Sequence, residues 1–458
     1  MATVLPNTAS PVETKGILGP QDYAIKTLNL LFANGQRMEL KKLVFSLDYY
    51  EDIYSFVTSG SITLNDAQGF PELLQLTGNE FIEINFGKYK DSVNSTDQIF
   101  RVYKMGERTP GKNLNSQRFT LYFCSEELLL SEQTKISKSY SGQKISEIVW
   151  DILLEQMQVD IKKIYNIEET TGVYDFLVPR LKPFEAISWV STYARPEGTD
   201  LIGADMLFFE TKDGYNFRSI QSMISSVPYA TYKYQLQNVD NLGGLQNKLS
   251  SILEYEFTKV YDSLSEISNG TFASKLLTID PLTRTFKNTN FDYSDFQKHV
   301  KTLNEGTITN DVVNRLGKTI TEASESVLKF MTSNADQLSV PFIKNKQAGV
   351  AKDIYAETYV PQRTAQLALA NYNVIKLTIP GDPGITAGRT IQLDLPSIKP
   401  STSTRQLDKF YSGKYLVTAV RQMIGVNTFQ TVLEITKDSF PNSPASADNT
   451  AFKSSVKA

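Results

Sequence analysis

Hydrophobic and polar residues alternate with a period of two along much of the chain, a pattern typical of β-strands that bury one face. Between residues 36 and 125 the alternating runs include 43–48, 81–86, 99–104 and 119–124. Segments rich in Asn, Gly, Asp and Pro separate these runs and indicate turns. The pattern predicts a first small antiparallel β-barrel or sandwich over residues 21–125.

The apolar period then changes from two to that of a helix. Five apolar residues between Ile145 and Leu153 fall at the spacing of an amphipathic helix over 144–157. Pro183 is suited to the first position of a second helix, 184–194. Asp213-Gly214 separates two short strands and indicates a hairpin. Residues 126–225 are therefore predicted to form an α+β module of two helices and a hairpin.

A second strand-rich region occupies residues 346–440. After a short helix at 362–370, alternating strands are expected at 375–379, 391–395, 415–419 and 429–435, with a turn at 425–427. Residues 226–345 are interpreted as a strand-rich connecting segment that contributes to this second barrel and carries a helical insert near 312–331. Residues 1–20 are expected to form an N-terminal arm, and 441–458 a flexible tail.

Four glycines are candidates for structural turns: Gly214, Gly381, Gly388 and Gly413. Gly381 lies in a Pro-Gly-Asp-Pro-Gly sequence and Gly388 immediately precedes a strand, positions where positive φ angles are common. The segment 382–388 has neither the lysine of a phosphate-binding loop nor the spacing of a dinucleotide motif. We therefore expect it to turn a hairpin.

Few residues of this chain are suited to catalysis or metal binding. The only histidine, His299, lies in a polar segment, and a Ser-His-Asp triad would need it. Cys124 is the only cysteine, so the chain cannot form an internal disulfide or a cysteine-based zinc site. We expect Cys124 to be a buried thiol. Acidic pairs such as Glu126-Glu127 and Glu168-Glu169 are expected to be solvated. We predict no catalytic residue, no cofactor and no metal site.

The length of the chain and its lack of membrane-spanning or targeting segments narrow the classes of protein to which it can belong. With 458 residues the chain is too long for one hydrophobic core, so several domains are expected. Trp150 and Trp189 are expected in helix-packed cores rather than as sugar-stacking residues. No apolar run is long enough to span a membrane, and the N-terminal residues lack the features of a secretory signal. The expected site of folding is a cytoplasm.

Several segments, in this order along the chain, resemble the baseplate hub of contractile-tailed bacteriophages and the related base of type VI secretion spike proteins. They are 183–187 followed by 208–219, then 268–274 with Asp280 and 291–293, and finally 380–382 with 387–388 and 411–417. The resemblance covers most of residues 30–440. It implies a mainly β fold with an α+β insertion, in which two small antiparallel, tube-type β-barrels accompany a helix-containing module.

The resemblance also implies a function. The chain would form a homotrimer whose two barrels imitate six-fold symmetry, joining a hexameric tail tube to a trimeric spike around the channel for genome delivery. Expected partners are the tail tube protein or a tube initiator, the central spike protein, the tape measure protein and baseplate wedge proteins. The location would be the tail baseplate of a virion assembled in the host cytoplasm. The alternatives are the equivalent hub of another contractile injection system, a cell-wall hydrolase and a glycan-binding tail protein.

The charge generates a prediction about DNA. Phosphate contacts dominate duplex binding and require clustered Lys or Arg, but the formal net charge is −3 and no basic run occurs. We expect no stable binding at physiological salt. Filter binding or fluorescence anisotropy with a random duplex should give a dissociation constant weaker than about 1 μM, within the non-specific range. Tighter binding would contradict the prediction.

Overall fold

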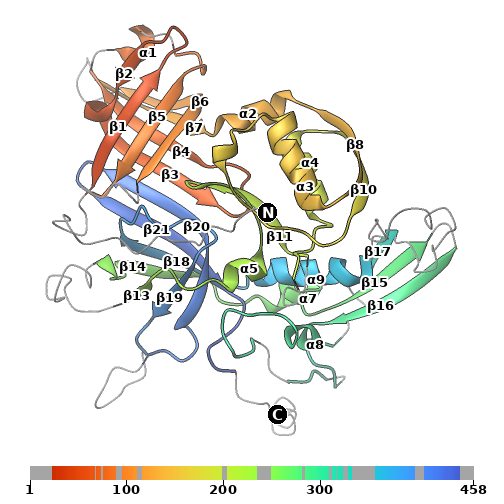
Figure 1. Ribbon diagram of the computed structural model, residues 1–458. Coiled ribbons are helices and arrows are strands. Elements are labelled where there is room, and N and C mark those ends of the chain that lie inside the picture. The colour runs from red at the N-terminus through yellow and green to blue at the C-terminus, as the bar shows by residue number, and fades with distance from the viewer. Residues whose placement is uncertain are drawn as a thin grey trace.

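The computed structural model of the protein describes residues 23–67, 69–73, 76–88, 95–110, 116–198, 204–234, 249–280, 284–308, 312–315, 317–322, 328–332, 356–397 and 407–443. The chain is mainly β, as predicted, and its helices gather beside the central sheet (Figure 1). The predicted N-terminal arm, 1–20, and the tail from residue 444 lie outside the described residues.

Thirteen of the described strands form one sheet. Eleven of them follow the order β14-β18-β21-β20-β3-β4-β7-β6-β5-β1-β2, while β19 pairs with both β13 and β20. The strands are Ala24–Leu31 (β1), Arg37–Glu39 (β2), Val44–Asp52 (β3), Ser59–Asp66 (β4), Phe81–Gly87 (β5), Thr96–Pro110 (β6), Gln117–Cys124 (β7), Thr231–Lys233 (β13), Glu254–Lys259 (β14), Asn373–Pro380 (β18), Thr390–Asp394 (β19), Gly413–Gly425 (β20) and Phe429–Lys437 (β21).

Strand β20 joins the two strand-rich regions. On one edge it forms the predicted antiparallel hairpin with β21. On the other edge its first residues, 413–416, pair with β19, and its later residues, 419–425, pair antiparallel with β3. Because β20 has 13 residues, a single edge is long enough for two partners in succession. The register runs from Ala419 opposite Asp52 to Gly425 opposite Ser46.

The prediction of two separate barrels is therefore corrected: the described strands form no closed barrel, and strands of both regions belong to one open sheet. The first half curls far enough that the Tyr23 hydroxyl donates to the Gly425 carbonyl at 2.8 Å and its ring meets Phe429 edge-on. Within the described residues, no backbone pairing joins β1 to β20 or β21. Alternation predicts strands and their buried faces, but it does not specify which distant strands become neighbours.

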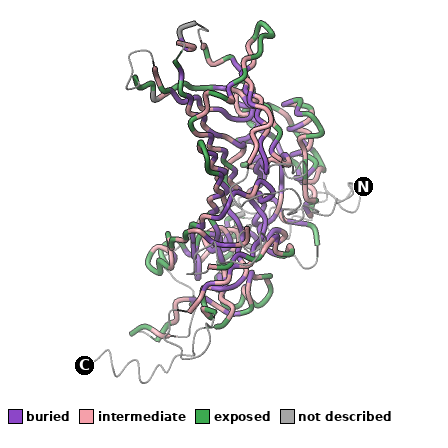
Figure 2. The backbone as a smooth tube through the Cα atoms, turned by 90° about the vertical axis from the view of Figure 1, so that its left-hand side faces the viewer, coloured by how far each residue is buried: buried purple, intermediate pink, exposed green. Residues whose placement is uncertain are grey.

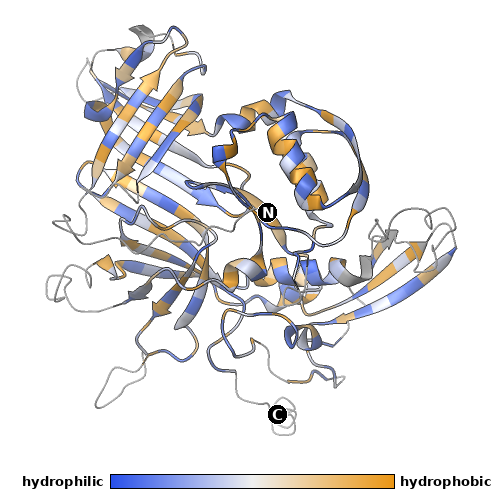
Figure 3. Ribbon diagram, in the orientation of Figure 1, coloured by the Kyte–Doolittle hydropathy of each residue, from blue (hydrophilic) through white to orange (hydrophobic). Residues whose placement is uncertain are grey.

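Hydrophobic and hydrophilic residues alternate along many strands of the main sheet (Figure 3). Because successive side chains of a strand point to opposite faces, this alternation directs the apolar ones to one face. Buried residues concentrate in the interior of the molecule, whereas exposed ones lie mainly at the strand ends and loops (Figure 2). The first half of the sheet buries aromatic and branched residues from six of its strands, including Leu28, Leu47, Tyr49, Ile62, Ile84, Phe86, Phe100, Leu121 and Phe123. Ile424 and Phe429 from the β20–β21 hairpin belong to the same cluster, so this core spans both halves.

The predicted α+β module contains a hydrophobic core of its own. The apolar stripe from Ile145 to Leu153 is buried, but the predicted single helix is an α-helix followed by a π-helical turn. Asp213 and Lys212 form the two-residue turn of the predicted hairpin. The elements are Glu126–Gln133 (α2), Ile136–Gln143 (β8), Ile145–Asp151 (α3), the π turn Ile152–Gln156, Ile164–Ile167 (β9), Tyr174–Leu181 (β10), Pro183–Ser191 (α4), Met206–Thr211 (β11), Gly214–Ser219 (β12) and Ile220–Ile224 (α5).

The remaining elements form a three-stranded side sheet and the helices around it. The side sheet, in the order β16-β15-β17, extends away from the main sheet (Figure 1, right). Its strands are Ala273–Asp280 (β15), Thr285–Asp292 (β16) and Leu328–Thr332 (β17), and the helices are Ser263–Asn269 (α7), Tyr293–Gln297 (α8) and Ala356–Leu369 (α9); α1, Phe70–Leu73, lies near the start of the chain.

The helical insert predicted near 312–331 is wrong where the structure describes it. Residues 328–332 are extended and pair in parallel with β15, and the described parts of 312–322 contain neither helix nor strand. The apolar spacing of Val327 and Leu328 fits either conformation, and pairing with the edge of β15 decides for the strand. The predicted helix at 362–370 is longer: α9 begins at Ala356 and contains Pro361.

Candidate functional site at the domain junction

The most elaborate polar site in the described structure lies where the two halves of the main sheet meet the α+β module. Three segments distant in sequence converge there: the end of β3, the β11–β12 hairpin and the segment that precedes β19. Two buried glutamates, Glu51 and Glu210, connect these segments. Neither was predicted as a site residue.

Glu51 lies at the end of β3 with its side chain directed inward, and only 2% of its surface is exposed. Its carboxylate oxygens accept hydrogen bonds from the Lys212 N–H at 2.7 Å and the Ala387 N–H at 3.0 Å. The Tyr49 hydroxyl donates a third, at 3.0 Å. One side chain of the first region therefore binds the backbone of both the module and the second region. Burial raises the pKa of Glu51 to about 7, and the two backbone hydrogen bonds offset part of that rise.

Glu210 makes the reciprocal connection from the module. One of its carboxylate oxygens accepts from the Thr58 N–H at 2.8 Å, from the Thr58 hydroxyl at 3.1 Å and from the Ser125 hydroxyl at 2.5 Å. Thr58 precedes β4 and Ser125 follows β7, so Glu210 binds two adjacent strand ends of the first region. Burial raises the pKa of Glu210 to about 7, against the effect of these hydrogen bonds.

The sequence contains a signal for these two residues. Glu51 continues the inward positions of Leu47 and Tyr49, and Glu210 ends the largely apolar run 206–210. A carboxylate on the buried face of a strand is costly unless donors surround it. A glutamate in phase with a core stripe therefore indicates a buried hydrogen-bond centre, although its partners cannot be read from the sequence.

A third buried carboxylate stabilises the predicted 380–384 turn. Asp382 accepts from the Gly384 N–H at 2.9 Å and from the hydroxyls of Tyr229 and Tyr232 at 3.2 to 3.3 Å. Its own N–H donates to the Thr431 hydroxyl at 2.8 Å. The turn is thus attached to β13, β21 and the segment before β13. Burial raises the pKa of the Asp382 carboxyl.

The four predicted turn glycines occupy constrained positions. Gly214, Gly388 and Gly413 have φ angles of +124°, +81° and +134°, which side chains other than glycine rarely adopt. Gly381 has no positive φ, contrary to one of the expected reasons; instead an added Cβ would lie 2.2 Å from the Phe429 ring. These contacts support a structural role for the glycines, which remains a prediction.

The residues considered for catalysis are scattered. His299 is exposed just after α8, and Cys124 is buried, as predicted, at the end of β7. The expected solvation of the acidic pairs is wrong for two members. Glu127 is buried and accepts from Lys163 at 2.6 Å, and Glu168 is half-buried and accepts from Arg218 at 3.2 Å. Each binds a cation of the module and so contributes to its packing.

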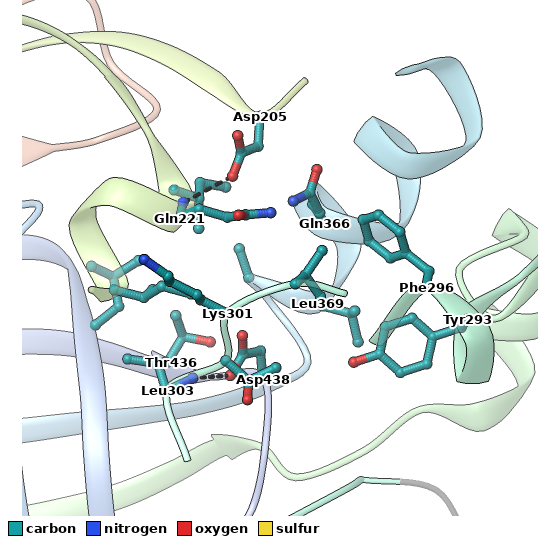
Figure 4. A pocket seen from close by; sticks show the side chains of 16 residues that line it. Asp205, Gln221, Tyr293, Phe296, Lys301, Leu303, Gln366, Leu369, Thr436 and Asp438 are labelled. Atoms are coloured by element: carbon teal, nitrogen blue, oxygen red, sulfur yellow. Dashed lines mark hydrogen bonds between the residues drawn. The ribbon is translucent and has the colours of Figure 1, made fainter. Parts of the chain in front are cut away.

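One pocket lies between α5, α8, α9 and the β20–β21 hairpin (Figure 4). Its cavity volume is about 30 Å³, enough for one or two water molecules and far below that of a ligand site. Asp205 at one end accepts from the Gln221 N–H at 2.9 Å, and Asp438 at the other accepts from the Leu303 N–H at 3.0 Å. The pocket walls are largely apolar, including Phe296. This cavity is too small to hold a substrate. Among the described residues, no cluster of three His, Cys, Asp or Glu side chains fits a metal ion.

Comparison with known proteins agrees with the resemblance read from the sequence. No family model matches the chain. The sequence is 22% identical over 411 residues to a protein named "Probable baseplate hub protein gp334" of Vibrio phage KVP40, covering 86% of this chain and 90% of that protein. The chain is similar to phage baseplate hub proteins. The predicted resemblance to a baseplate hub is thereby confirmed.

Solved structures show that this chain has the fold of two tail proteins, one of them from a prophage. A tail protein from Neisseria meningitidis MC58 aligns with a TM-score of 0.51 at 12% identity, covering 92% of this chain and all of that one. The 43 kDa tail protein of prophage MuSo2 from Shewanella oneidensis aligns with a TM-score of 0.50 at 8% identity, covering 90% and 99%. At these identities the likeness concerns the fold alone. None of the described helices is long and apolar enough to cross a membrane.

The close packing of Gly381 generates a prediction. Gly381→Val should lower the thermal unfolding midpoint markedly, at a cost of about 1–3 kcal/mol or more, because the new side chain overlaps the Phe429 ring. Differential scanning fluorimetry measures the midpoint. Gly106→Val is the control, because Gly106 also has no positive φ and an added Cβ there meets only the Tyr122 and Lys104 side chains, at 3.2 and 3.7 Å. If Gly381→Val lowers the unfolding midpoint no more than the control variant does, the packing of Gly381 against Phe429 does not limit stability.

The raised pKa values of Glu51 and Glu210 generate a prediction about pH. Between pH 4.5 and about 7 the folded protein retains two protons that the unfolded chain releases. The contribution of these two groups to stability is therefore fully present below about pH 4.5 and is lost as pH rises to about 7, by about 3 kcal/mol for each carboxyl. Thermal midpoints at pH 5 and pH 8 should show this fall, and Glu51→Gln/Glu210→Gln should reduce it.

Substitution of the exposed Glu305 by Gln is the matched control and should leave the fall from pH 5 to pH 8 unchanged. If the midpoint of the double variant falls from pH 5 to pH 8 as much as that of the original protein, Glu51 and Glu210 are not the groups whose deprotonation lowers stability.

Proposed function

We propose that this protein is the structural hub of a phage tail baseplate. In this proposal three copies form a ring in which the two strand-rich regions of each chain imitate six-fold symmetry. One side of the ring would receive the hexameric tail tube or its initiator, and the other the trimeric central spike. The tape measure protein and baseplate wedge proteins are further proposed partners. The observation that supports this proposal most directly is the match to a baseplate hub protein over 86% of the chain.

The joined main sheet supports the ring arrangement. Residues of both regions share one sheet through the pairing of β20 with β3, and the buried carboxylates of Glu51 and Glu210 connect it to the module. Such a rigid unit is suited to present two similar surfaces to a symmetric tube. Among the described strands, β14 and β2 end the sheet; edge strands favour association with another copy, and cyclic closure limits that association to a ring.

The solvent-facing side of the sheet supports a role in lining a channel. In the register of β3, β4 and β20, Asp48 faces Ser61 and Met423, so these residues share the side opposite to Leu47 and Ile62. This side is mainly polar in the middle of the sheet, where it carries Ser46, Asp48, Ser59, Ser61, Thr63 and Gln430 together with Tyr50, Met423 and Arg421, the last paired with Asp48. We propose that it faces the channel, where small polar groups offer little adhesion to passing DNA.

A structural rather than enzymatic role is part of the proposal. The matched relative is named for its place in the baseplate. Of the candidate acid residues, Glu127 and Glu168 have structural partners, and the described pocket holds no more than one or two water molecules. The same hub architecture would suit another contractile injection particle, and the proposal is made for the phage tail because the matched relative comes from a phage.

The oligomeric state tests the proposal. Mass photometry of the purified chain at micromolar concentration should give a species of three 51.4-kDa chains. Two-dimensional class averages from electron microscopy should show a ring with a central hole and six similar lobes. A monomer at this concentration would contradict the proposal. So would a trimer whose two strand-rich regions lie at different radii from the axis.

A further inference from the structure

Within the described residues, the side sheet has one covered and one uncovered face. Helix α9 covers one face: Leu276 packs against Tyr359, and the Lys329 ammonium donates to the Thr364 hydroxyl at 2.6 Å. Directly opposed residues of paired strands lie on the same face of a sheet. The register therefore assigns the residues next to Leu276 and Lys329 to the face directed away from α9.

That uncovered face is apolar. Ile279 lies opposite Phe286, and Leu277 lies opposite Phe330. The exposed fraction is 77% for Phe286, 65% for Phe330 and 43% for Ile279, while Leu277 is half-buried. We refer to Leu277, Ile279, Phe286 and Phe330 as the side-sheet face. Several large apolar side chains in neighbouring positions, all open to water, are typical of a protein–protein contact.

A second exposed apolar surface lies on the segment that precedes this sheet. Tyr261 is 70% exposed, and Leu264 and Ile267, one turn apart on α7, are 80% and 39% exposed. Residues three apart on a helix lie on the same side, so Leu264 and Ile267 form one apolar strip. We refer to Tyr261, Leu264 and Ile267 as the α7 surface.

The charges beside the two surfaces have opposite signs. Lys275 extends the side-sheet face along β15, and the exposed Arg284 lies just before β16, whereas Lys287 pairs with Thr278 and belongs to the face that α9 covers. The exposed Asp262 carboxylate lies beside the α7 surface, where it caps the helix by accepting from the Ser265 N–H at 3.1 Å. Charges of opposite sign around two apolar patches favour contact between the patches and set their orientation.

We propose that the side-sheet face of one copy of this chain binds the α7 surface of the next copy. The inference rests on the proposed ring and adds to it a contact outside the main sheet. Both surfaces belong to the same chain and remain exposed within it, so neither covers the other intramolecularly. A contact between two different surfaces of identical chains is heterologous, and such contacts repeat head to tail until a ring closes. The occupant of each surface is therefore a second copy.

Cysteine cross-linking tests this contact. In a Cys124→Ala background, Leu264→Cys and Phe286→Cys are combined in one chain and treated with a short bis-maleimide. Denaturing electrophoresis should then show covalent species of two and three chains. The control combines Phe286→Cys with Leu177→Cys, because Leu177 is 68% exposed but belongs to the α+β module. The control chain should remain at the mass of one chain.

The possible results distinguish failure of the proposed contact from failure of the hub function on which it rests. A trimer by mass photometry without cross-links between positions 264 and 286 would overturn the contact and leave the hub proposal standing. Cross-links of equal yield in the control would also overturn the contact. A monomer by mass photometry would overturn both.

A second measurement does not require introduced thiols. Phe286→Ser/Phe330→Ser should raise at least tenfold the concentration at which half of the trimer dissociates, with unchanged circular dichroism. Ile161→Ser/Leu177→Ser, two exposed apolar residues outside both surfaces, should leave that concentration unchanged. An unchanged trimer in the first variant would overturn the contact.

Discussion

The pairing of β20 with β3 is the interaction on which the rest of the structure depends. It joins residues about 370 positions apart, as the Arg421–Asp48 ion pair across it illustrates with a separation of 373. Without it the chain would contain two independent curved sheets with an open edge each. With it, the two regions share a backbone ladder, and the α+β module is held against both of them.

The buried glutamates strengthen this pairing at a point where apolar contacts alone would be less specific. Hydrophobic contacts tolerate small sliding movements, whereas a carboxylate surrounded by backbone donors requires one particular arrangement. Glu51 and Glu210 bind opposite sides of the junction, so a displacement of the module relative to either region would leave a buried carboxylate without its donors. The desolvation of these carboxylates opposes folding, and their hydrogen bonds fix the orientation of the module relative to the two regions.

The sequence predicted local features better than distant ones. The β20–β21 and β11–β12 hairpins were predicted because alternation and turn residues are encoded within short segments. Phe45 shows where this reasoning fails: it was assigned to an alternating strand, but the bulge between Val44 and Ser46 leaves it exposed, with the Arg118 guanidinium 3.7 Å from its ring. The shared edge of β20 and the donors to Glu51 depend on contacts between remote segments, which no local pattern specifies. The resemblance to a hub was read from the sequence and agrees with the comparisons, while the glutamate site emerged only from the structure.

The position of β20 near the end of the chain has a consequence for synthesis. Strand β3 leaves the ribosome long before its partner exists: at about 5–20 residues per second, some 370 residues correspond to about 20–75 seconds. During that interval the β3 edge is without its native neighbour. A chain interrupted before residue 413 would lack the strand that joins its halves. In the proposed assembly, only completed chains would offer the joined surface to their neighbours, and the topology itself would exclude truncated products.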